Sequence, residues 1–268
     1  MKKLIIVFVL FLSTFSCFSQ TEFTTCLFDG ARNRVIPITV YQPQKVNSKT
    51  KVIIFNHGYD GNKNRKSNQT YSYLTRFLSQ KGFYVISIQH ELPNDPLLAM
   101  EGDFMQTRMP NWERGVANIY FTIQEFKKLK PQLDWDKLIL IGHSNGGDMT
   151  MLFATKYPHL INKAISMDHR RMIMPRTEKP RLYTLRGCDY DADAGVLPTK
   201  QEQEQFHLMS DAYIVDELMR ALTEFPTLWK WWNRINITWI RLCICRCWKN
   251  NLVICSLSAP AVSARASF

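Results

Sequence analysis

Ser144 lies in the segment GHSNGG, residues 142–147, with a glycine two positions away on either side. This G-x-S-x-G spacing follows the apolar run LILI and comes before a segment with helical spacing, so it predicts a sharp turn from a strand into a helix. Such a turn exposes the serine hydroxyl as a nucleophile. The first N–H groups of the helix then face the negative charge that develops in acyl transfer. The motif predicts a serine hydrolase that cleaves carboxylic esters through an acyl-enzyme.

A second segment, NHGYDGN at residues 56–62, follows another short apolar run. The loop at this position supplies the second donor to the oxyanion in sites of this kind, and the residue after the nucleophile supplies the first. We expect the backbone amides of Tyr59 and Asn145 to fill these two roles. His57 fits a structural role that supports the loop, and His143 is expected to point away from the reaction.

The triad acid must follow a strand that comes after the nucleophile, where it can orient the histidine. Asp168 ends the segment KAISMD and is the preferred acid. Asp189 in GCDYDADAG is the alternative acid, and Asp191 and Asp193 in the same loop also stay open. This acidic loop lacks the glycine and the distal glutamate of a calcium loop, so the sequence predicts no metal site.

The triad histidine should come last in the chain, and His207 is the histidine that follows the acidic loop. However, no apolar strand precedes His207, and the residues after it have helical spacing. Two hypotheses therefore stay open. In the first, the chain is a serine esterase with His207 as its base. In the second, it is a catalytically impaired protein of the same fold, a pseudo-enzyme or binding module without the triad histidine.

The elements that must position these residues alternate between strand and helix. Short apolar runs predict strands, at residues 35–43, 51–58, 83–89, 137–142, 163–168 and 180–187. Helical spacing of apolar residues predicts helices, at residues 71–82, 112–129 and 146–158. This alternation predicts an α/β fold with a mostly parallel sheet and helices on both faces, incomplete at its C-terminal end. Pro37 and Pro43 are typical of an edge strand.

Residues 90–111 form the longest irregular stretch and follow the carboxyl end of a predicted strand. Ligands bind at that edge of such sheets, so this stretch is a candidate lid. It contains six apolar residues: Leu97, Leu98, Met100, Phe104, Met105 and Met109. These residues favour short to medium acyl esters as substrates. The alternative is that they simply pack the loop onto the domain.

Five segments of the chain together resemble one protein family. These segments are RNRVIPITVYQP, FNHGYDGN, MPNWERG, GHSNGG and AISMDHRRM. In order and spacing they resemble the α/β-hydrolase superfamily, and within it the dienelactone-hydrolase-like and plasma platelet-activating-factor-acetylhydrolase-like branch. The resemblance covers roughly residues 27–200. It implies an exported esterase or lipase-like acyl hydrolase without a metal or organic cofactor, and an acid one strand after the serine.

The first residues have the features of a secretory signal peptide. Lys2 and Lys3 come before an apolar run that is too short for a bilayer span, and small residues follow it. We expect residues 1–19 to be removed and the chain to be secreted or periplasmic. Lipid modification of Cys17 is the minor alternative. The hydrolase domain is then expected at residues 20–206.

Residues 207–268 differ in composition from the rest of the chain. No glycine follows Gly195, no acidic residue follows Glu224, and five of the seven tryptophans lie between residues 229 and 248. A sheet edge rich in loops seldom lacks glycine over such a length. We expect this basic tail, rich in tryptophan and cysteine, to result from a frameshift or fusion. The rival hypothesis is a tail that rests on a membrane surface.

The formal net charge of +11 is not spread evenly along the chain. The signal-like start and the tail carry most of it, so the predicted domain is only weakly basic. A weakly basic domain needs no polyanionic partner, and we predict no nucleic-acid binding. The expected partner is a small-molecule ester, and the sequence says nothing about the oligomeric state.

Overall fold

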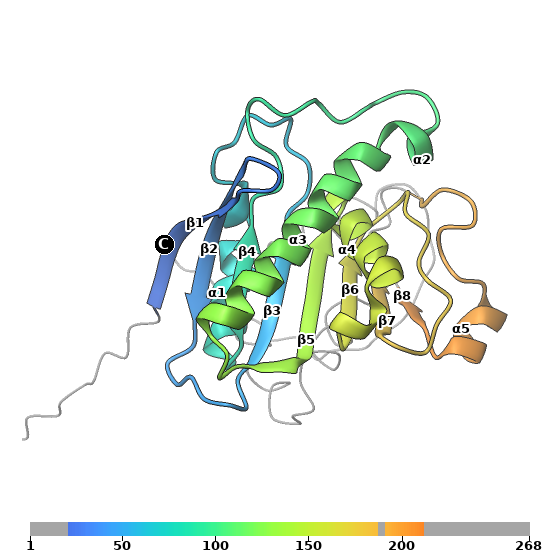
Figure 1. Ribbon diagram of the computed structural model, residues 1–268. Coiled ribbons are helices and arrows are strands. Elements are labelled where there is room, and N and C mark those ends of the chain that lie inside the picture. Colours follow the sequence, from blue (N-terminus) through green and yellow to red (C-terminus); the bar gives the residue numbers. More distant parts are fainter. Residues whose placement is uncertain (1–20, 187–190, 212–268) are drawn as a thin grey trace, which may run out of the picture. The chain divides into compact units, whose positions relative to one another are not determined.

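The computed structural model describes residues 21–186 and 191–211 (Figure 1). The chain divides into two compact units, one of residues 1–184 and 192–210 and the other of residues 185–191 and 211–268. The first unit holds the fold described below. The predictions for the signal peptide, Cys17 and Asp189, and those for the tail beyond residue 211, lie outside the described residues.

The sheet has eight strands in the order β1-β2-β4-β3-β5-β6-β7-β8. The strands are β1 (Thr21–Asp29), β2 (Arg34–Gln42), β3 (Lys51–Asn56), β4 (Tyr84–Ile88), β5 (Asp134–His143), β6 (Lys163–Met167), β7 (Arg181–Leu185) and β8 (Met209–Asp211). Strands β4, β3, β5 and β6 pair in parallel, whereas β2 pairs antiparallel with β1 and β4. This arrangement confirms the predicted, mostly parallel sheet.

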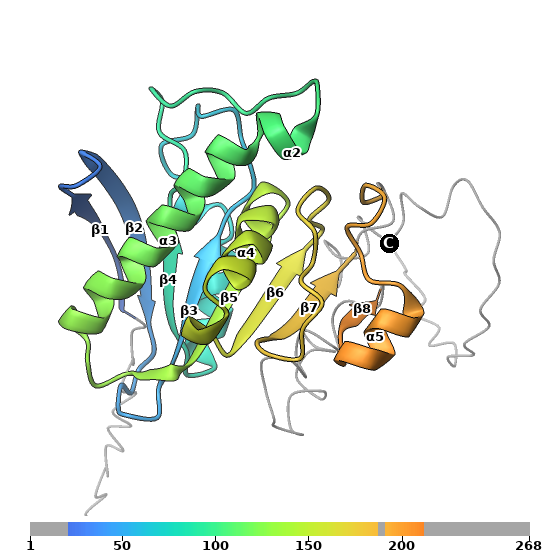
Figure 2. The same ribbon diagram turned by 45° about the vertical axis from the view of Figure 1, so that its right-hand side comes forward.

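Helices cover both faces of the sheet. The α-helices are α1 (Ser72–Gln80), α2 (Phe104–Thr107), α3 (Met109–Leu129), α4 (Asn145–Lys156) and α5 (Lys200–Phe206), and two 3-10 helices are η1 (Ser67–Gln69) and η2 (Pro158–Leu160). Helices α3 and α4 lie together on one face, and α1 lies on the other (Figures 1 and 2). In the part of the chain that the structure describes, no helix is long and apolar enough to cross a membrane.

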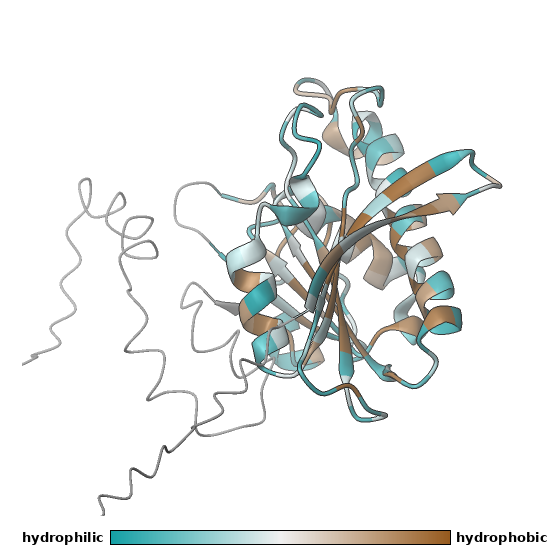
Figure 3. Cartoon of the chain, turned by 90° about the vertical axis from the view of Figure 1, so that its left-hand side faces the viewer, coloured by the Kyte–Doolittle hydropathy of each residue, from teal (hydrophilic) through white to brown (hydrophobic). Residues whose placement is uncertain are grey.

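The core lies between the sheet and these helices. The central strands are buried on both sides, and Ile53, Ile54 and Phe55 of β3 have no exposed surface. Figure 3 shows this arrangement as hydrophobic strands between helices whose outward faces are more polar. Burial on both sides explains why these strands have continuous apolar runs instead of an alternating pattern.

The prediction that residues 35–43 form an edge strand is wrong. Strand β2 lies between β1 and β4, and β1, which the sequence analysis did not predict, forms the edge. Pro37 is tolerated because it lies just beyond the last β2–β4 pair, Ile38 with Ile88, and its carbonyl accepts a hydrogen bond from Gln89 N. Strand β1 was missed because most of its residues are exposed.

Two helix boundaries also differ from the prediction. Helix α3 begins at Met109 instead of residue 112, because Pro110 fits the first turn of a helix, where its missing N–H costs nothing. After His207 the chain forms β8 at Met209–Asp211, whereas the sequence predicted a helix there. Helix α5 begins with a capping box between Thr199 and Glu202, which the sequence analysis overlooked.

Candidate active site

Ser144 lies at the turn between β5 and α4, as the glycine spacing predicts. Its backbone has φ 49° and ψ −120°, a conformation that L-residues seldom adopt outside functional turns. Its N–H donates to the carbonyl of Met167 on β6 at 2.8 Å. A Cβ on Gly146 would lie 2.3 Å from the carbonyl oxygen of His57, and one on Gly142 would lie 2.2 Å from that of Gly146. Only glycine allows this close approach of three backbone segments.

The loop after β3 passes directly beside the serine. A Cβ on Gly58 would lie 3.4 Å from Ser144 Cβ and 2.9 Å from His143 Nδ1. The backbone of Gly58 therefore lies next to Ser144, which is where a second oxyanion donor would be required if Ser144 is the nucleophile. The hydroxyl of Tyr59 accepts a hydrogen bond from Leu98 N at 3.1 Å, and this contact ties the loop to the candidate lid.

The side chain of Asn145 is fully engaged in a buried network. Its Nδ2 donates to Glu91 Oε1 at 3.1 Å and to Asn111 Oδ1 at 3.0 Å, while its Oδ1 accepts from Trp112 Nε1 at 2.9 Å. An asparagine side chain has two N–H donors, so neither is left for a substrate. Asn145 can serve the oxyanion only through its backbone N–H, the role the sequence analysis assigned to it.

His57 has the structural surroundings that the sequence analysis expected. It is 1% exposed, its Nδ1 donates to the carbonyl of Gly58 at 2.8 Å, and its Nε2 accepts from His90 N at 3.0 Å. His90 itself is bonded through Nε2 to Asn56 Oδ1 at 2.9 Å, and burial holds the pKa of His90 well below its usual range. Both imidazoles thus stabilise the loop after β3 through buried hydrogen bonds.

Sequence reasoning missed the network around Asn145. Glu91 lies shortly after β4, beyond Gln89 and His90, and Asn111 and Trp112 lie in the segment MPNWERG, which was noted only as part of a family pattern. The one signal in the sequence was an acidic residue placed shortly after a buried strand. Because Glu91 lies in a loop and the other two residues lie in α3, only their tertiary contacts reveal that they converge on Asn145.

Asp168 directly follows β6, the strand that pairs with β5, and β5 ends just before the serine. His143 pairs with Met167, so the two residues that follow them, Ser144 and Asp168, leave neighbouring parallel strands at the same edge. Asp168 has φ 56°, and its Oδ2 accepts from Arg170 at 2.7 Å. Asp193, another of the acids left open, is half exposed and paired with Arg171.

Asp148 of α4 fixes the loop that follows Asp168. Its Oδ1 accepts the backbone N–H groups of Arg170, Arg171 and Met172 at 2.9–3.2 Å. Burial raises the pKa of Asp148 to about 6, although these hydrogen bonds oppose the shift. The loop after Asp168 is therefore held by the same helix that begins next to Ser144.

No histidine is bonded to the serine. All six histidines of the chain lie within the described residues, and none of them forms a hydrogen bond with Ser144 Oγ there. His143 Nδ1 is 2.5 Å from the hydroxyl of Tyr71, and His169 Nδ1 is 2.5 Å from Ser166 Oγ. His207 is exposed and directly follows the last residue of α5. Figures 1 and 2 show α5 near the end of the sheet where β6 and β7 begin. Its role as the base stays a prediction.

The candidate lid touches the loops on either side of the serine. Leu98 bonds to Tyr59 at one end, while Phe104 of α2 lies between the guanidinium groups of Arg108 and Arg171, 4.2 and 4.7 Å from its ring centre. Of the six apolar lid residues, Leu98 is buried and Met105 and Met109 pack against the core. Leu97 and Met100 are exposed. The exposed residues are consistent with a lid, and the buried ones are consistent with a loop that packs onto the domain.

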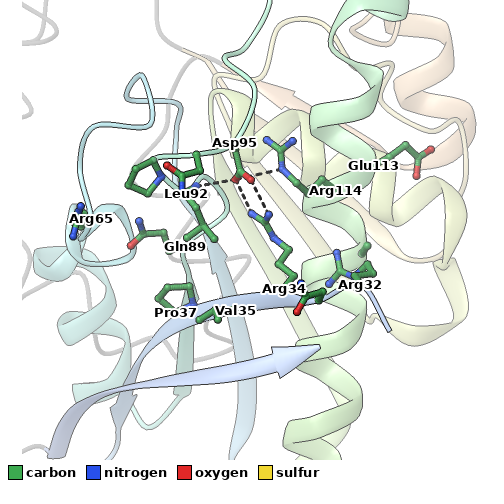
Figure 4. Close-up of a pocket in the computed structure, with 14 residues that line it drawn as sticks. Arg32, Arg34, Val35, Pro37, Arg65, Gln89, Leu92, Asp95, Glu113 and Arg114 are labelled. Atoms are coloured by element: carbon green, nitrogen blue, oxygen red, sulfur yellow. Dashed lines mark hydrogen bonds and ion pairs between the residues drawn. The ribbon is translucent and has the colours of Figure 1, made fainter. Parts of the chain in front are cut away.

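A hollow of about 940 Å³ lies beside the loop that carries Glu91 (Figure 4). Asp95 accepts from Arg34 at 2.7 and 2.8 Å, lies 3.6 Å from Arg114, and also accepts from Leu92 N. Ser144 is not among the residues that line this hollow. Arg32, Arg34 and Arg114 in its lining pair with carboxylates of the fold, so the hollow mainly shows how residues 89–95 are fixed.

The model of one protein family, BD-FAE, matches residues 38–174, just over half of the chain. The chain belongs to the BD-FAE family. The matched range contains Tyr59, Glu91, Ser144, Asn145 and Asp168, and it ends before His207. Within this BD-FAE member, the family match therefore covers the candidate residues around Ser144 but not the candidate base.

Two curated relatives are serine hydrolase-like proteins. The one from Dictyostelium discoideum is 25% identical over 114 residues, covering 42% of this chain and 26% of its own length. The human one is 26% identical over 101 residues, covering 38% and 48%. This BD-FAE member thus spans less than half the length of either relative.

A solved structure described as a thermostable esterase is 16% identical, with a TM-score of 0.54, over 83% of this chain and 62% of the other. This likeness confirms the α/β-hydrolase fold of the BD-FAE member. The narrower dienelactone-hydrolase-like and acetylhydrolase-like branch stays a prediction.

Proposed function

We propose that this chain is an exported serine hydrolase that cleaves carboxylic esters, with Ser144 as its nucleophile. The observation that carries the proposal is the strained backbone of Ser144 at the start of α4, with the Gly58 backbone directly beside it. A buried structural serine would have no need of this conformation or of the glycines around it. The family and the hydrolase-like relatives support the same reaction class.

In the proposed reaction, Ser144 Oγ attacks the ester carbonyl carbon and gives up its proton to a base. The carbonyl oxygen becomes an oxyanion, and the backbone N–H groups of Asn145 and Tyr59 donate hydrogen bonds to it. The tetrahedral intermediate then expels the alcohol, which takes the proton, and leaves an acyl-enzyme. Water attacks the acyl carbon in the same way and releases the carboxylic acid.

Asp168 is the proposed acid, and His207 is the base assigned from the sequence. The adjacent strand ends of Ser144 and Asp168 favour this acid. The alternative function is a binding module or impaired enzyme. The observation that favours it is that no histidine bonds to Ser144 within the described residues. Catalytic hydrogen bonds often form only with substrate bound, so the two candidates require an experiment.

The proposed substrates are short to medium acyl esters. The exposed Leu97 and Met100 of the lid support this choice, because they offer apolar surface that the fold does not use. Export rests on the signal-like residues 1–19. A secreted or periplasmic fraction that lacks the chain would contradict it.

An active-site-directed phosphonate tests the nucleophile. We expect it to label Ser144 in the unaltered chain and to label nothing in Ser144→Ala. In the control Ser72→Ala, Ser144 should be labelled as in the unaltered chain. Mass spectrometry of the labelled peptide identifies the residue. Equal labelling of Ser144→Ala would contradict the assignment.

Hydrolysis of nitrophenyl esters separates the two candidate functions. If His207 is the base, His207→Ala should lower kcat by about 10⁴-fold or more, whereas a matched His159→Ala change should have no effect. Phosphonate labelling without turnover in the unaltered chain would favour the impaired enzyme. Among acyl chains of two to ten carbons, a maximum at intermediate length would support the acyl role of the lid.

A further inference from the structure

The carboxyl group of Glu91 lies between the two segments that are proposed to hold the oxyanion. Its side chain is 1% exposed. Its Oε1 accepts from Asn145 Nδ2 at 3.1 Å, and its Oε2 lies 3.4 Å from His57 Nε2. Asn145 belongs to one donor segment, and His57 begins the loop that contains the other, Tyr59. One buried side chain therefore touches both segments.

The hydrogen bonds of His57 determine which form of Glu91 fits between them. His57 Nε2 accepts from the backbone N–H of His90 at 3.0 Å, so this nitrogen carries no proton and presents its lone pair. Its Nδ1 carries the proton and donates to Gly58. An ionised Oε2 would face that nitrogen with no donor between them. A protonated Oε2 avoids this repulsion and can share the lone pair with the His90 N–H as a second, weaker donor.

The surroundings of Glu91 also disfavour a charge. Burial raises the pKa of the Glu91 carboxyl above its usual value, and the nearby Asp60 carboxylate acts in the same direction. His57, Arg114 and the hydrogen bond from Asn145 act against the shift but do not cancel it. Within the described residues, Oε2 has no hydrogen-bond partner that would hold a negative charge.

Residues 89–95 are fixed firmly enough for Glu91 to act as a spacer. Arg34 donates to the carbonyl of His90 at 2.7 Å and to both oxygens of Asp95, as Figure 4 shows for Asp95. Gln89 Nε2 donates to the carbonyl of Glu91 at 3.1 Å. The backbone on both sides of Glu91 is therefore held in place. Its side chain can then fix the distance between the two segments that it contacts.

We propose that Glu91 is a positioning residue which, as a neutral carboxylic acid, joins the two halves of the oxyanion hole and sets the distance between the Asn145 and Tyr59 amides. The role rests on the proposed function, because it concerns the same reaction. Its protonation state and its effect on the two amides do not depend on turnover and can be tested separately.

Substitutions at Glu91 test the positioning role. Gln can accept from Asn145 and donate to His57 as the acid does, so Glu91→Gln should keep the rate of Ser144 labelling and kcat within about 3-fold. Glu91→Ala removes both contacts and should lower both by about 10- to 100-fold with KM little changed, less than the loss of a whole oxyanion donor. Glu113→Gln on α3 removes an exposed carboxylate and is the matched control. A Gln variant as slow as the Ala variant, or an Ala variant at full rate, would overturn the proposal.

The pH dependence gives a second kinetic test. Ionisation of Glu91 should weaken the oxyanion hole as pH rises through its raised pKa, and Gln cannot ionise. The labelling rate of Glu91→Gln, divided by that of the unaltered chain, should therefore increase with pH. A ratio that is constant or falls with pH would contradict the neutral acid.

Carbon NMR of chains labelled at the glutamate carboxyl needs no turnover. The signal lost in Glu91→Gln should titrate at a higher pH than the signals of exposed glutamates, and the amide signals of Asn145 and Tyr59 should move in Glu91→Ala but not in Glu91→Gln. A signal that ionises together with the exposed glutamates, or unmoved amides, overturns this proposal even if Ser144 is catalytic. The expected NMR result without phosphonate labelling would instead refute only the esterase function.

Discussion

The two halves of the candidate site differ in how densely their side chains are bonded. Around the oxyanion, Glu91, Asn111, Trp112 and Asn145 form a closed network of buried hydrogen bonds. Around the proposed acid and base, Asp168 is partly buried and bonded to Arg170, and His207 is exposed at the end of α5. The residues of the proposed oxyanion half all lie within residues 51–148. The acid and base half depends on residues that follow β6.

This difference shows what each half requires of the fold. Oxyanion stabilisation needs dipoles that are already in place, so it benefits from rigid, buried support. Proton transfer needs only one imidazole that reaches both serine and acid, and in this fold that residue comes from late in the chain. A change near the C-terminus can therefore remove the base while leaving the oxyanion half intact.

Replacing the acid tests the weaker half most directly. Asp168→Asn should lower kcat by about 10³- to 10⁴-fold if Asp168 orients a histidine, because the amide favours the wrong tautomer. Asp193→Asn, at a half-exposed carboxylate that pairs with Arg171, is the control and should change kcat less than about 2-fold. An unchanged rate in Asp168→Asn would show that the base, if present, is oriented by another acid.

Adding one methyl group tests the rigidity of the oxyanion half. In Gly146→Ala the new Cβ would lie 2.3 Å from the carbonyl oxygen of His57, and neither backbone can move freely. We expect the free energy of unfolding to fall by about 3 kcal/mol or more. In Gly30→Ala the nearest atom is 3.8 Å away, so this control should be near neutral. Urea unfolding measures both, and a stable Gly146→Ala chain would contradict the close packing.

Asp148 joins the two halves and should make stability depend on pH. Burial raises its folded pKa from 3.8 to about 6, so the protonated form favours the folded state. The contribution is present below pH 4 and is lost as pH rises to 6, at an upper limit of about 3 kcal/mol. Asp148→Asn keeps the acceptor for the three loop amides and should remove this loss. Urea unfolding of both chains at pH 4 and pH 7 measures the free energy of unfolding. An equal change with pH in the two chains would refute the role of Asp148.

The smallest expected effect comes from one hydrogen bond in the network. Trp112→Phe removes the N–H that Asn145 Oδ1 accepts, so the backbone of Asn145 loses one of its anchors. We expect the rate of Ser144 labelling to fall about 5-fold, equivalent to about 1 kcal/mol, with KM unchanged. Trp135→Phe removes a similar bond, to the carbonyl of Lys130, and is the control. Equal effects of the two changes would show that the loss is only one of general stability.

The sequence by itself determined the features that follow from local pattern. The continuous apolar runs of β3, β4 and β5 and the glycines at 142 and 146 identify a parallel sheet and a strained turn, because burial on both faces and close backbone approach allow few other residues. For this reason the sequence predicts the turn at Ser144 and Asn145 and the loop that contains Gly58. Strand β1 and the start of α3 were not, since exposed strands and first helical turns tolerate many residues.

Only the tertiary structure decided which distant residues meet. Glu91, Asn111 and Trp112 come from a loop and a helix, yet all three converge on the side chain of Asn145. Likewise, Pro37 lies in an internal strand because β1 pairs with the outer side of β2. His207 lies at an exposed helix end. Spacing along the chain records periodic burial but not contacts between elements, because a hydrogen bond between distant residues leaves no period in the sequence.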